Sequence, residues 1–337
     1  MRELRSLPSD IDLVAAGFPC TDLSQAGRTA GIKGPASGLV SHVFEALRLT
    51  SKKRRLPTLL FENVPNMLVL DQGQAMGYLI QELEILGYRW AYRTVDSRFT
   101  GVPQRRRRVL LVASVEDDPC RVLFADDAGD RDPQELASDA FGFYWTEGRT
   151  GIGWAIDAVP TLKGGSSVGI PSPPAIWVPA ASPSRRFIKP GIDDAEWLQG
   201  FPRGWTEVFE IASLRNGPRW KLVGNAVTVG VASWVASRIA IPGDRLGAER
   251  AWDRSKSWPK AAWGSRGKIY EVSVSEFPLH RPYRHILEVV DITNAEPLSI
   301  RALTGFRKRL NQGNLGRHPG FRDHLESEFD LLRKSCA

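Results

Sequence analysis

The first 113 residues alternate between two hydrophobic periods, and this alternation limits the fold more than any other feature of the chain. Short apolar runs typical of buried strands cover 11–16, 58–61, 88–95 and 109–113. Apolar residues at helical spacing lie between the first three runs: Leu39, Val43 and Leu47, then Met76, Leu79, Ile80, Leu83 and Leu86, closed by Gly87. This order of strands and helices predicts an α/β fold with a parallel sheet.

The rest of the chain is less regular. Residues 114–137 are acidic and predicted to form a loop, and 164–185 hold five prolines, which favours extended, irregular structure. A helical pattern returns at 226–239, with Asn225 as a candidate N-cap. From about 241 the chain is basic, with 17 Lys and Arg against 12 Asp and Glu, and we expect 241–337 to form a separate basic appendage.

Charge and cysteine content narrow the class of protein. The net charge is +7 and the isoelectric point is about 9.4, which favours a polyanionic partner. Cys20, Cys120 and Cys336 are too widely spaced for a CxxC zinc site, and an odd number argues against a disulfide framework. We find neither a signal peptide nor an apolar run that could span a membrane. We therefore predict a cytoplasmic protein without a metal site.

Cys20 is the first candidate for chemistry. It lies in Gly17-Phe18-Pro19-Cys20, four residues past the apolar run 11–16. In open α/β sheets the ligand crevice lies at the carboxyl ends of the strands, so this turn is a suitable place for a nucleophile. The alternative is a buried structural cysteine.

Glu62-Asn63-Val64-Pro65 follows the next strand, 58–61, at the same expected end of the sheet. A carboxylate beside a thiol can act as an acid or bind a ring nitrogen of a substrate. Asn63 adds a donor and an acceptor. The alternative is a solvated strand end.

Four consecutive arginines, Arg105 to Arg108, follow Gln104 and precede the strand that starts at Val109. Alternate residues of an extended segment share a face, so Arg106 and Arg108 are expected on one side and Arg105 and Arg107 on the other. One pair could then enter the crevice while the other contacts phosphate. The alternative is a solvated basic face.

These motifs together resemble the DNA cytosine-5 methyltransferase family. Five motifs occur in the family's order over about 210 residues: Gly17-Phe18-Pro19-Cys20 with Ser24, Glu62-Asn63-Val64, Gln104-x-Arg106-x-Arg108, Leu198-Gln199-Gly200-Phe201-Pro202 and Gly224-Asn225-Ala226-Val227. The resemblance implies a Rossmann-like fold that uses S-adenosylmethionine, and methylation of double-stranded DNA in the nucleoid, as in restriction–modification systems.

The resemblance also implies roles for single residues. The Cys20 thiolate would attack C6 of a cytosine that has left the helix. Glu62 would hold N3 and the exocyclic amine, Arg106 would polarise O2, Arg108 would fix Glu62, and Asn63 would order the backbone. The methyl donor would contact Pro19, Asn225 and Ala226, and the DNA would contact Ser24, Gln104 and Gly200.

One part of the family pattern is missing from the stretch before Cys20. The family binds its donor through an N-terminal FxGxG turn, and no such turn occurs between Met1 and Cys20. We therefore expect an N-terminally incomplete core whose strand 11–16 has an open apolar edge. Such a chain would either pair with a second polypeptide that carries the missing strands or be a fragment.

The predicted organisation has four parts. Residues 1–113 form a partial catalytic core, 114–185 a short target-recognition region, 186–240 a return to the core, and 241–337 the basic appendage. In the appendage, further DNA contacts are expected from Arg307, Lys308, Arg309, Asn311, Gln312 and Asn314. Two other functions stay open, namely a catalytically silent DNA-binding subunit and a tRNA cytosine-5 methyltransferase.

Overall fold

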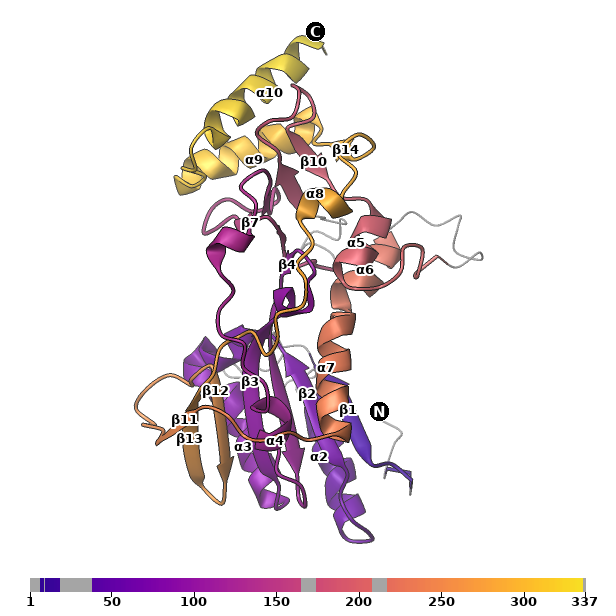
Figure 1. Ribbon diagram of the computed structural model, residues 1–337, viewed down its shortest axis with the longest axis vertical. Coiled ribbons are helices and arrows are strands. Elements are labelled where there is room, and N and C mark those ends of the chain that lie inside the picture. The colour runs from indigo at the N-terminus through magenta and orange to yellow at the C-terminus, as the bar shows by residue number, and fades with distance from the viewer. Residues whose placement is uncertain (1–6, 9, 19–37, 165–173, 208–216, 336–337) are drawn as a thin grey trace. The chain divides into compact units, whose positions relative to one another are not determined.

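A computed structural model describes residues 7–8, 10–18, 38–164, 174–207 and 217–335 (Figure 1). The chain divides into two compact units, and it passes from one to the other several times. The first unit consists of Met1–Asp96, Arg107–Asp130 and Trp234–Leu279. The second unit consists of Ser97–Arg106, Arg131–Ser233 and His280–Ala337.

The first unit contains a seven-stranded sheet in the order β1-β2-β5-β3-β12-β13-β11. The strands are β1 (Leu13–Gly17), β2 (Thr58–Asn63), β3 (Arg89–Asp96), β5 (Arg107–Ser114), β11 (Ala248–Ala251), β12 (Ala261–Ser265) and β13 (Lys268–Ser273). Only β1 and β2 pair in parallel. Strand β5 lies between β2 and β3 and pairs antiparallel with both, so β3 runs in the same direction as β1 and β2, and the prediction of a parallel sheet is wrong where β5 and β12 pair with their neighbours. The reason is that no crossover helix joins β3 to β5, so the chain returns in the opposite direction.

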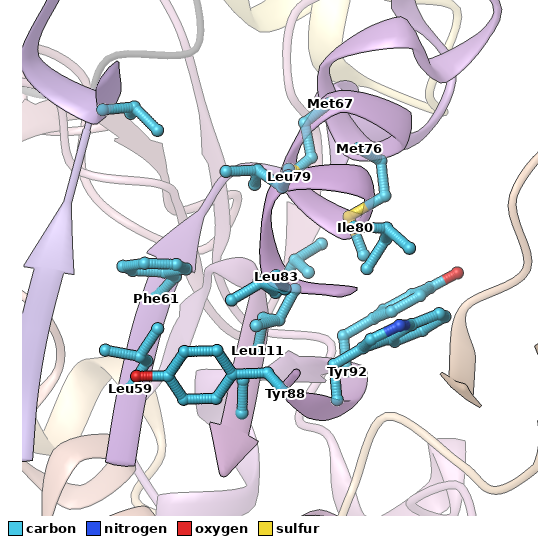
Figure 2. Close-up of a cluster of buried hydrophobic side chains, with 14 of the residues drawn as sticks. Leu59, Phe61, Met67, Met76, Leu79, Ile80, Leu83, Tyr88, Tyr92 and Leu111 are labelled. Atoms are coloured by element: carbon cyan, nitrogen blue, oxygen red, sulfur yellow. The ribbon is translucent and has the colours of Figure 1, made fainter. Parts of the chain in front are cut away.

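Two helices, α2 (Gly38–Ser51) and α3 (Gln74–Ile85), cover one face of this sheet. The side chains that meet there alternate along the strands and recur at helical spacing along the helices, as burial on one face requires. They include Phe44, Leu47 and Trp90. Figure 2 shows others of this cluster, among them Leu59, Phe61, Leu79, Leu83, Tyr92 and Leu111. Short 3₁₀ segments η2 (Pro65–Leu68) and η3 (Leu70–Gly73) lead from β2 into α3.

Arg93 of β3 lies fully buried on the opposite face, beside α4 (Cys120–Leu123). Its guanidinium donates to the carbonyls of Ser275 and Leu123, at 2.9 and 3.0 Å, and to Asp127 Oδ1 at 3.0 Å. Burial lowers the pKa of Arg93 to about 10, against the opposing effect of Asp127. This one side chain therefore joins the sheet to two distant segments of the chain.

The second unit contains a five-stranded sheet, β14-β10-β9-β6-β7, and a two-stranded one, β4-β8. The strands are β4 (Gln104–Arg105), β6 (Phe141–Phe143), β7 (Ala155–Ile156), β8 (Val159–Pro160), β9 (Ala175–Trp177), β10 (Phe187–Lys189) and β14 (Glu296–Pro297). The helical segments are η4 (Ser97–Thr100), η5 (Pro133–Glu135), α5 (Ile192–Leu198), α6 (Gly217–Asn225), α8 (Ile286–Val289), α9 (Ile300–Gly313) and α10 (Phe321–Ser335), while α7 (Val229–Ala240) begins here and ends in the first unit.

Aromatic side chains build the core between the five-stranded sheet and α9 and α10. Phe143 stacks on Phe306 with ring centroids 5.2 Å apart, and Phe321 contacts Phe143, Trp177 and Phe187 edge-on. Edge-to-face rings of this kind add to the energy of burial. The C-terminal helices, drawn in yellow in Figure 1, are therefore an integral part of this unit.

The expectation of a separate appendage from residue 241 is wrong. Strand β12 pairs with β3, with Ala261 opposite Arg93, so β11 to β13 extend the first unit's sheet. Residues 280–335 belong to the second unit. Basic composition describes the surface of this segment, whereas its buried residues Ala262 and Phe306 decide where it packs.

The predicted cap at Asn225 is also wrong. Asn225 ends α6, and α7 begins four residues later. Among the described residues, one stretch, 217–240, which holds both helices, is long and apolar enough to cross a membrane, a criterion that considers length and composition alone. Val231, Trp234 and Val235 of this stretch are buried in the protein, and core helices of soluble proteins can have the same length and hydropathy.

Candidate active site

Cys20, Pro19 and Ser24 lie outside the described residues, and the chain can be followed up to Phe18. Gly17, the last residue of β1, lies opposite Glu62 in the parallel register of β1 and β2. A Cβ at Gly17 would lie 3.4 Å from Glu62 Oε2. The segment that leads to Cys20 therefore leaves the sheet beside this carboxylate.

Glu62 forms an ion pair at the carboxyl end of β2. Its Oε1 lies 2.7 Å from Arg108 Nε, and the two side chains are 19% and 12% exposed. A partly buried ion pair is less screened by water than a surface pair, so each partner fixes the position of the other. The contact predicted between Arg108 and Glu62 is present.

Both groups of the Asn63 side-chain amide form hydrogen bonds to the backbone. Its side chain is 5% exposed, with Nδ2 donating to the Phe18 carbonyl at 3.1 Å and Oδ1 accepting from Val64 N–H at 2.8 Å. Phe18 also packs edge-on against Phe61 of β2, with ring centroids 5.9 Å apart. The backbone two residues before Cys20 is thus tied to β2, and the predicted role of Asn63 in ordering the backbone agrees with this contact.

Arg106 belongs to the second unit and is 2% exposed. Its Nη1 donates to the carbonyls of Leu162 and Gly224, at 3.1 and 3.3 Å, and its Nη2 donates to the Ala226 carbonyl at 2.7 Å. The guanidinium therefore joins two loops to the segment that carries it. The predicted contact between Arg106 and cytosine O2 stays untested, but these bonds give the side chain a structural role.

The arginine run is not one extended strand, and the expectation that Arg106 and Arg108 share a face stays a prediction. Strand β4 ends at Arg105, strand β5 begins at Arg107, and the Arg106 carbonyl accepts from Ser97 N–H at 2.9 Å. Arg107 pairs instead with Glu276. Periodicity along a strand does not apply where the strand is interrupted.

A buried network surrounds Gln104. Its Nε2 donates to the Leu198 carbonyl at 2.9 Å and to Gln199 Oε1 at 2.8 Å, and its Oε1 accepts from Leu162 N–H at 3.0 Å. Gln199 in turn donates to the Val223 carbonyl at 2.8 Å. Gln104 is fully buried, so its side chain lies in the interior and not at a DNA-binding surface as predicted.

Gly200 occupies the turn after α5 with φ +85°, a conformation that favours glycine. A Cβ there would lie 3.2 Å from Val229 Cβ. The neighbouring Glu196 is fully buried and accepts from the N–H groups of Gly204 and Thr206, at 2.6 and 2.8 Å. Burial opposes its ionisation, but bonds from Thr206 and Arg219 keep the pKa of Glu196 below its usual value. No sequence pattern marks Glu196.

Two glycines allow α6 to touch the loop after β8. A Cβ on Gly224 would lie 2.1 Å from the nitrogen of Gly164, which no packing permits. The chain turns immediately afterwards, where Ala226 N–H donates to the Leu222 carbonyl at 3.1 Å. Because both backbone groups of Ala226 are engaged within the unit and no helix begins at Asn225, the predicted donor contacts at these two residues lack structural support.

The chain is similar to several known proteins. A family model described as C-5 cytosine-specific DNA methylase matches residues 2–139. The Type II methyltransferase M2.BsuMI of Bacillus subtilis (strain 168) is 47% identical over 317 residues, covering 92% of this chain and 80% of that protein. The Type II methyltransferase M.MspI of Moraxella sp is 25% identical over 246 residues, covering 68% and 56%. The S. pombe Dnmt2 methyltransferase structure aligns with a TM-score of 0.47 and 15% identity, covering 68% and 78%.

Proposed function

The chain belongs to the C-5 cytosine-specific DNA methylase family, and on this premise we propose that it transfers a methyl group to C5 of a cytosine in double-stranded DNA. The observation that carries the proposal is the Glu62–Arg108 ion pair, which lies beside the strand that leads to Cys20. A carboxylate and a guanidinium held together can bind the N3 edge and the O2 carbonyl of one ring. The basic charge of the chain suits a DNA partner in the cytoplasm.

The chemistry assigned to the chain's own residues concerns the base. The Cys20 sulfur forms a bond to C6, and the electrons of the C5–C6 double bond become available at C5 for the incoming methyl carbon. Glu62 stabilises the protonated N3 during this step. The C5 proton then passes to solvent water, the electrons of the C5–H bond re-form the C5–C6 double bond, and the S–C6 bond breaks to return the Cys20 thiolate.

We assign the O2 contact to Arg108 and not to Arg106. Arg108 Nε lies 2.7 Å from the carboxylate that would hold the same base. Arg106 directs both terminal nitrogens to backbone carbonyls of its own unit. The geometry therefore supports Arg108 as the catalytic arginine and Arg106 as a positioning residue.

The methyl donor of this family is S-adenosylmethionine. Asn225 and Ala226, the two described residues expected to contact it, do not by themselves fit its site, because the backbone of Ala226 is engaged within the unit and the helix start expected at Asn225 is absent. Pro19 lies outside the described residues. The donor site therefore needs groups other than the described pair, Asn225 and Ala226.

We further propose that β1 docks a strand from a second polypeptide that carries the family's FxGxG turn. Among the described strands β1 pairs only with β2, and its apolar residue Leu13 is 40% exposed. Open apolar edges recruit strands by hydrogen bonding. A partner of this kind would add both a strand and donor contacts.

Co-purification of tagged chain with such a polypeptide tests this docking. We expect a 1:1 complex that Ala15→Lys disrupts, while Ile85→Lys, at an apolar position 62% exposed on α3, leaves it intact. A chain that stays monomeric and methylates DNA alone would contradict the docking proposal.

A covalent trap tests the activity itself. The chain, with and without the FxGxG polypeptide, is incubated with S-adenosylmethionine and duplex DNA that contains 5-fluorocytosine. Fluorine at C5 cannot leave as a proton does, so the S–C6 bond persists after methyl transfer. We expect an adduct that Cys20→Ala abolishes and Glu62→Gln slows by at least about 100-fold. An adduct that survives Cys20→Ala, or no adduct in either mixture, would refute the proposal.

The two alternative functions have no better support. The relatives M2.BsuMI and M.MspI are both named Type II methyltransferases. A catalytically silent subunit would bind DNA without forming the adduct. A tRNA enzyme would methylate transcripts in preference to duplex DNA, and the same purified protein can be tested on both.

A further inference from the structure

Helix α9 presents a continuous polar face to solvent. Leu303, Phe306 and Leu310 are buried against the aromatic core of the second unit. The exposed residues recur at helical spacing over about three turns and fall within one arc of the helix. They are Arg301, Thr304, Lys308, Asn311 and Gln312.

The charged residues of α9 are all basic. The helix holds four Arg and Lys and no Asp or Glu, whereas α10, packed beside it, holds four Asp and Glu. One acidic residue of α10 pairs with α9, where Arg307 Nε donates to Glu326 Oε1 at 2.7 Å, and both side chains of this pair are partly exposed. The exposed cations Arg301 and Lys308 leave the outer face of α9 positively charged.

Two of the predicted DNA contacts are already used inside the unit. Arg307 is held by Glu326, and Arg309 donates to the carbonyls of Trp145 and Glu147, at 2.9 and 3.2 Å. Burial lowers the pKa of Arg309, as expected for a cation drawn into the protein. These two arginines fix α9 in place, which leaves the outer face as the part that can meet a ligand.

We propose that α9 lies in the major groove of the DNA and reads part of the target sequence. Gln and Asn side chains can bond both edge groups of adenine, Lys contacts guanine or phosphate, and the Thr methyl group packs on thymine. The exposed residues span about 16 Å along the helix, enough to follow several base pairs. This inference rests on the proposed function and assigns specificity to a segment near the C-terminal end of the chain.

The test uses the full chain and a library of duplex DNA with random sequence. Bound duplexes are selected and sequenced, and affinity is measured at several salt concentrations. Lys308→Ala and Gln312→Ala change the outer face of α9. Lys334→Ala on α10 and Gln134→Ala in η5 are matched controls, because each removes the same side chain from another exposed position of the second unit.

We expect Lys308→Ala to weaken binding to all sequences about ten-fold and to lower the salt dependence by about one counterion. Gln312→Ala should lower the preference for one base at a single position about ten-fold. The controls should leave affinity and preference unchanged. An unfolding midpoint equal to that of the wild type in all four variants would show that their folding is intact.

Two results would overturn the inference: α9 variants that match their controls in affinity and preference, or a wild-type chain that binds no DNA. The covalent trap reports on the activity separately. DNA binding that depends on α9 without methyl transfer would support the reading helix and contradict the methylation. Methyl transfer with an unchanged preference in Gln312→Ala and an unchanged affinity in Lys308→Ala would contradict only the reading helix.

Discussion

At the scale of single residues, the two arginines of the Gln104-x-Arg106-x-Arg108 motif have different surroundings. Arg108 faces a carboxylate in the first unit, and Arg106 is enclosed by backbone carbonyls in the second. The motif in the sequence identifies both residues and predicts the contact of Arg108 with Glu62. It does not reveal the enclosure of Arg106, because the partners Gly224 and Ala226 are 118 and 120 residues away.

Alanine substitutions should separate the two arginines. Arg108→Ala should lower single-turnover methylation at least about 100-fold, as loss of one transition-state donor does, with little change in thermal stability. Arg106→Ala should destabilise the protein by about 3 kcal/mol, because it removes three buried hydrogen bonds to carbonyls. Calorimetry measures the unfolding temperature of both variants, and single-turnover kinetics measures their methylation rates. Equal shifts of the unfolding temperature in the two variants would contradict the different roles assigned to Arg106 and Arg108.

Asn63→Asp is a narrower test at the same site. The aspartate can still accept from Val64 N–H but cannot donate to the Phe18 carbonyl. We expect adduct formation by Cys20 to slow about ten-fold while the protein loses about 1 kcal/mol of stability. An adduct rate equal to that of the wild type would show that the tie to Phe18 does not position the nucleophile.

At the scale of elements, periodicity predicts the existence of strands and helices better than their direction. The pair β1 and β2 and the helices α2 and α3 lie where the alternating pattern places them. The antiparallel pairing of β3 with β5 was missed because side-chain period is the same in both directions. Pairing of β12 with β3 joins residues more than 160 positions apart, and no local pattern encodes that contact.

The contact between α6 and the loop after β8 should tolerate no added methyl group. Gly224→Ala should destabilise the protein by about 1–3 kcal/mol, because the new Cβ would overlap the backbone of Lys163 and Gly164. Gly151→Ala is the matched control, since a Cβ there meets nothing within 4 Å. The test is a comparison of the thermal unfolding midpoints of the two variants, and equal midpoints would contradict this account of the packing.

At the scale of the whole molecule, each unit depends on segments from distant parts of the chain. His285 belongs to the C-terminal part of the second unit and contacts Asp157 with Nδ1 2.6 Å from Oδ2. Asp157 is fully buried and also accepts from Ile286 N–H at 3.0 Å. This carboxylate therefore fastens the last segment of the second unit to its middle segment.

The stability of the second unit should depend on pH through this pair. The hydrogen bond to Asp157 raises the pKa of His285, so the folded state holds this proton more tightly than the unfolded state. The contribution is complete below the ordinary histidine pKa and is lost as pH rises through the raised value. His285→Asn should flatten this alkaline part of the curve. Urea unfolding from pH 6 to 9 measures it, and an unchanged slope in the variant would refute the assignment.

The interleaved order of the two units has a consequence for synthesis on the ribosome. Phe306 and Phe321 complete the aromatic core that Phe143 begins, so the second unit cannot close until almost the whole chain has emerged. A truncated product that ends after β13 keeps Cys20, Glu62 and Arg108 but leaves this core open. If α9 reads the target, such a product loses sequence selectivity and stability together. Because it is unstable, a methylase without sequence selectivity does not accumulate in the cell.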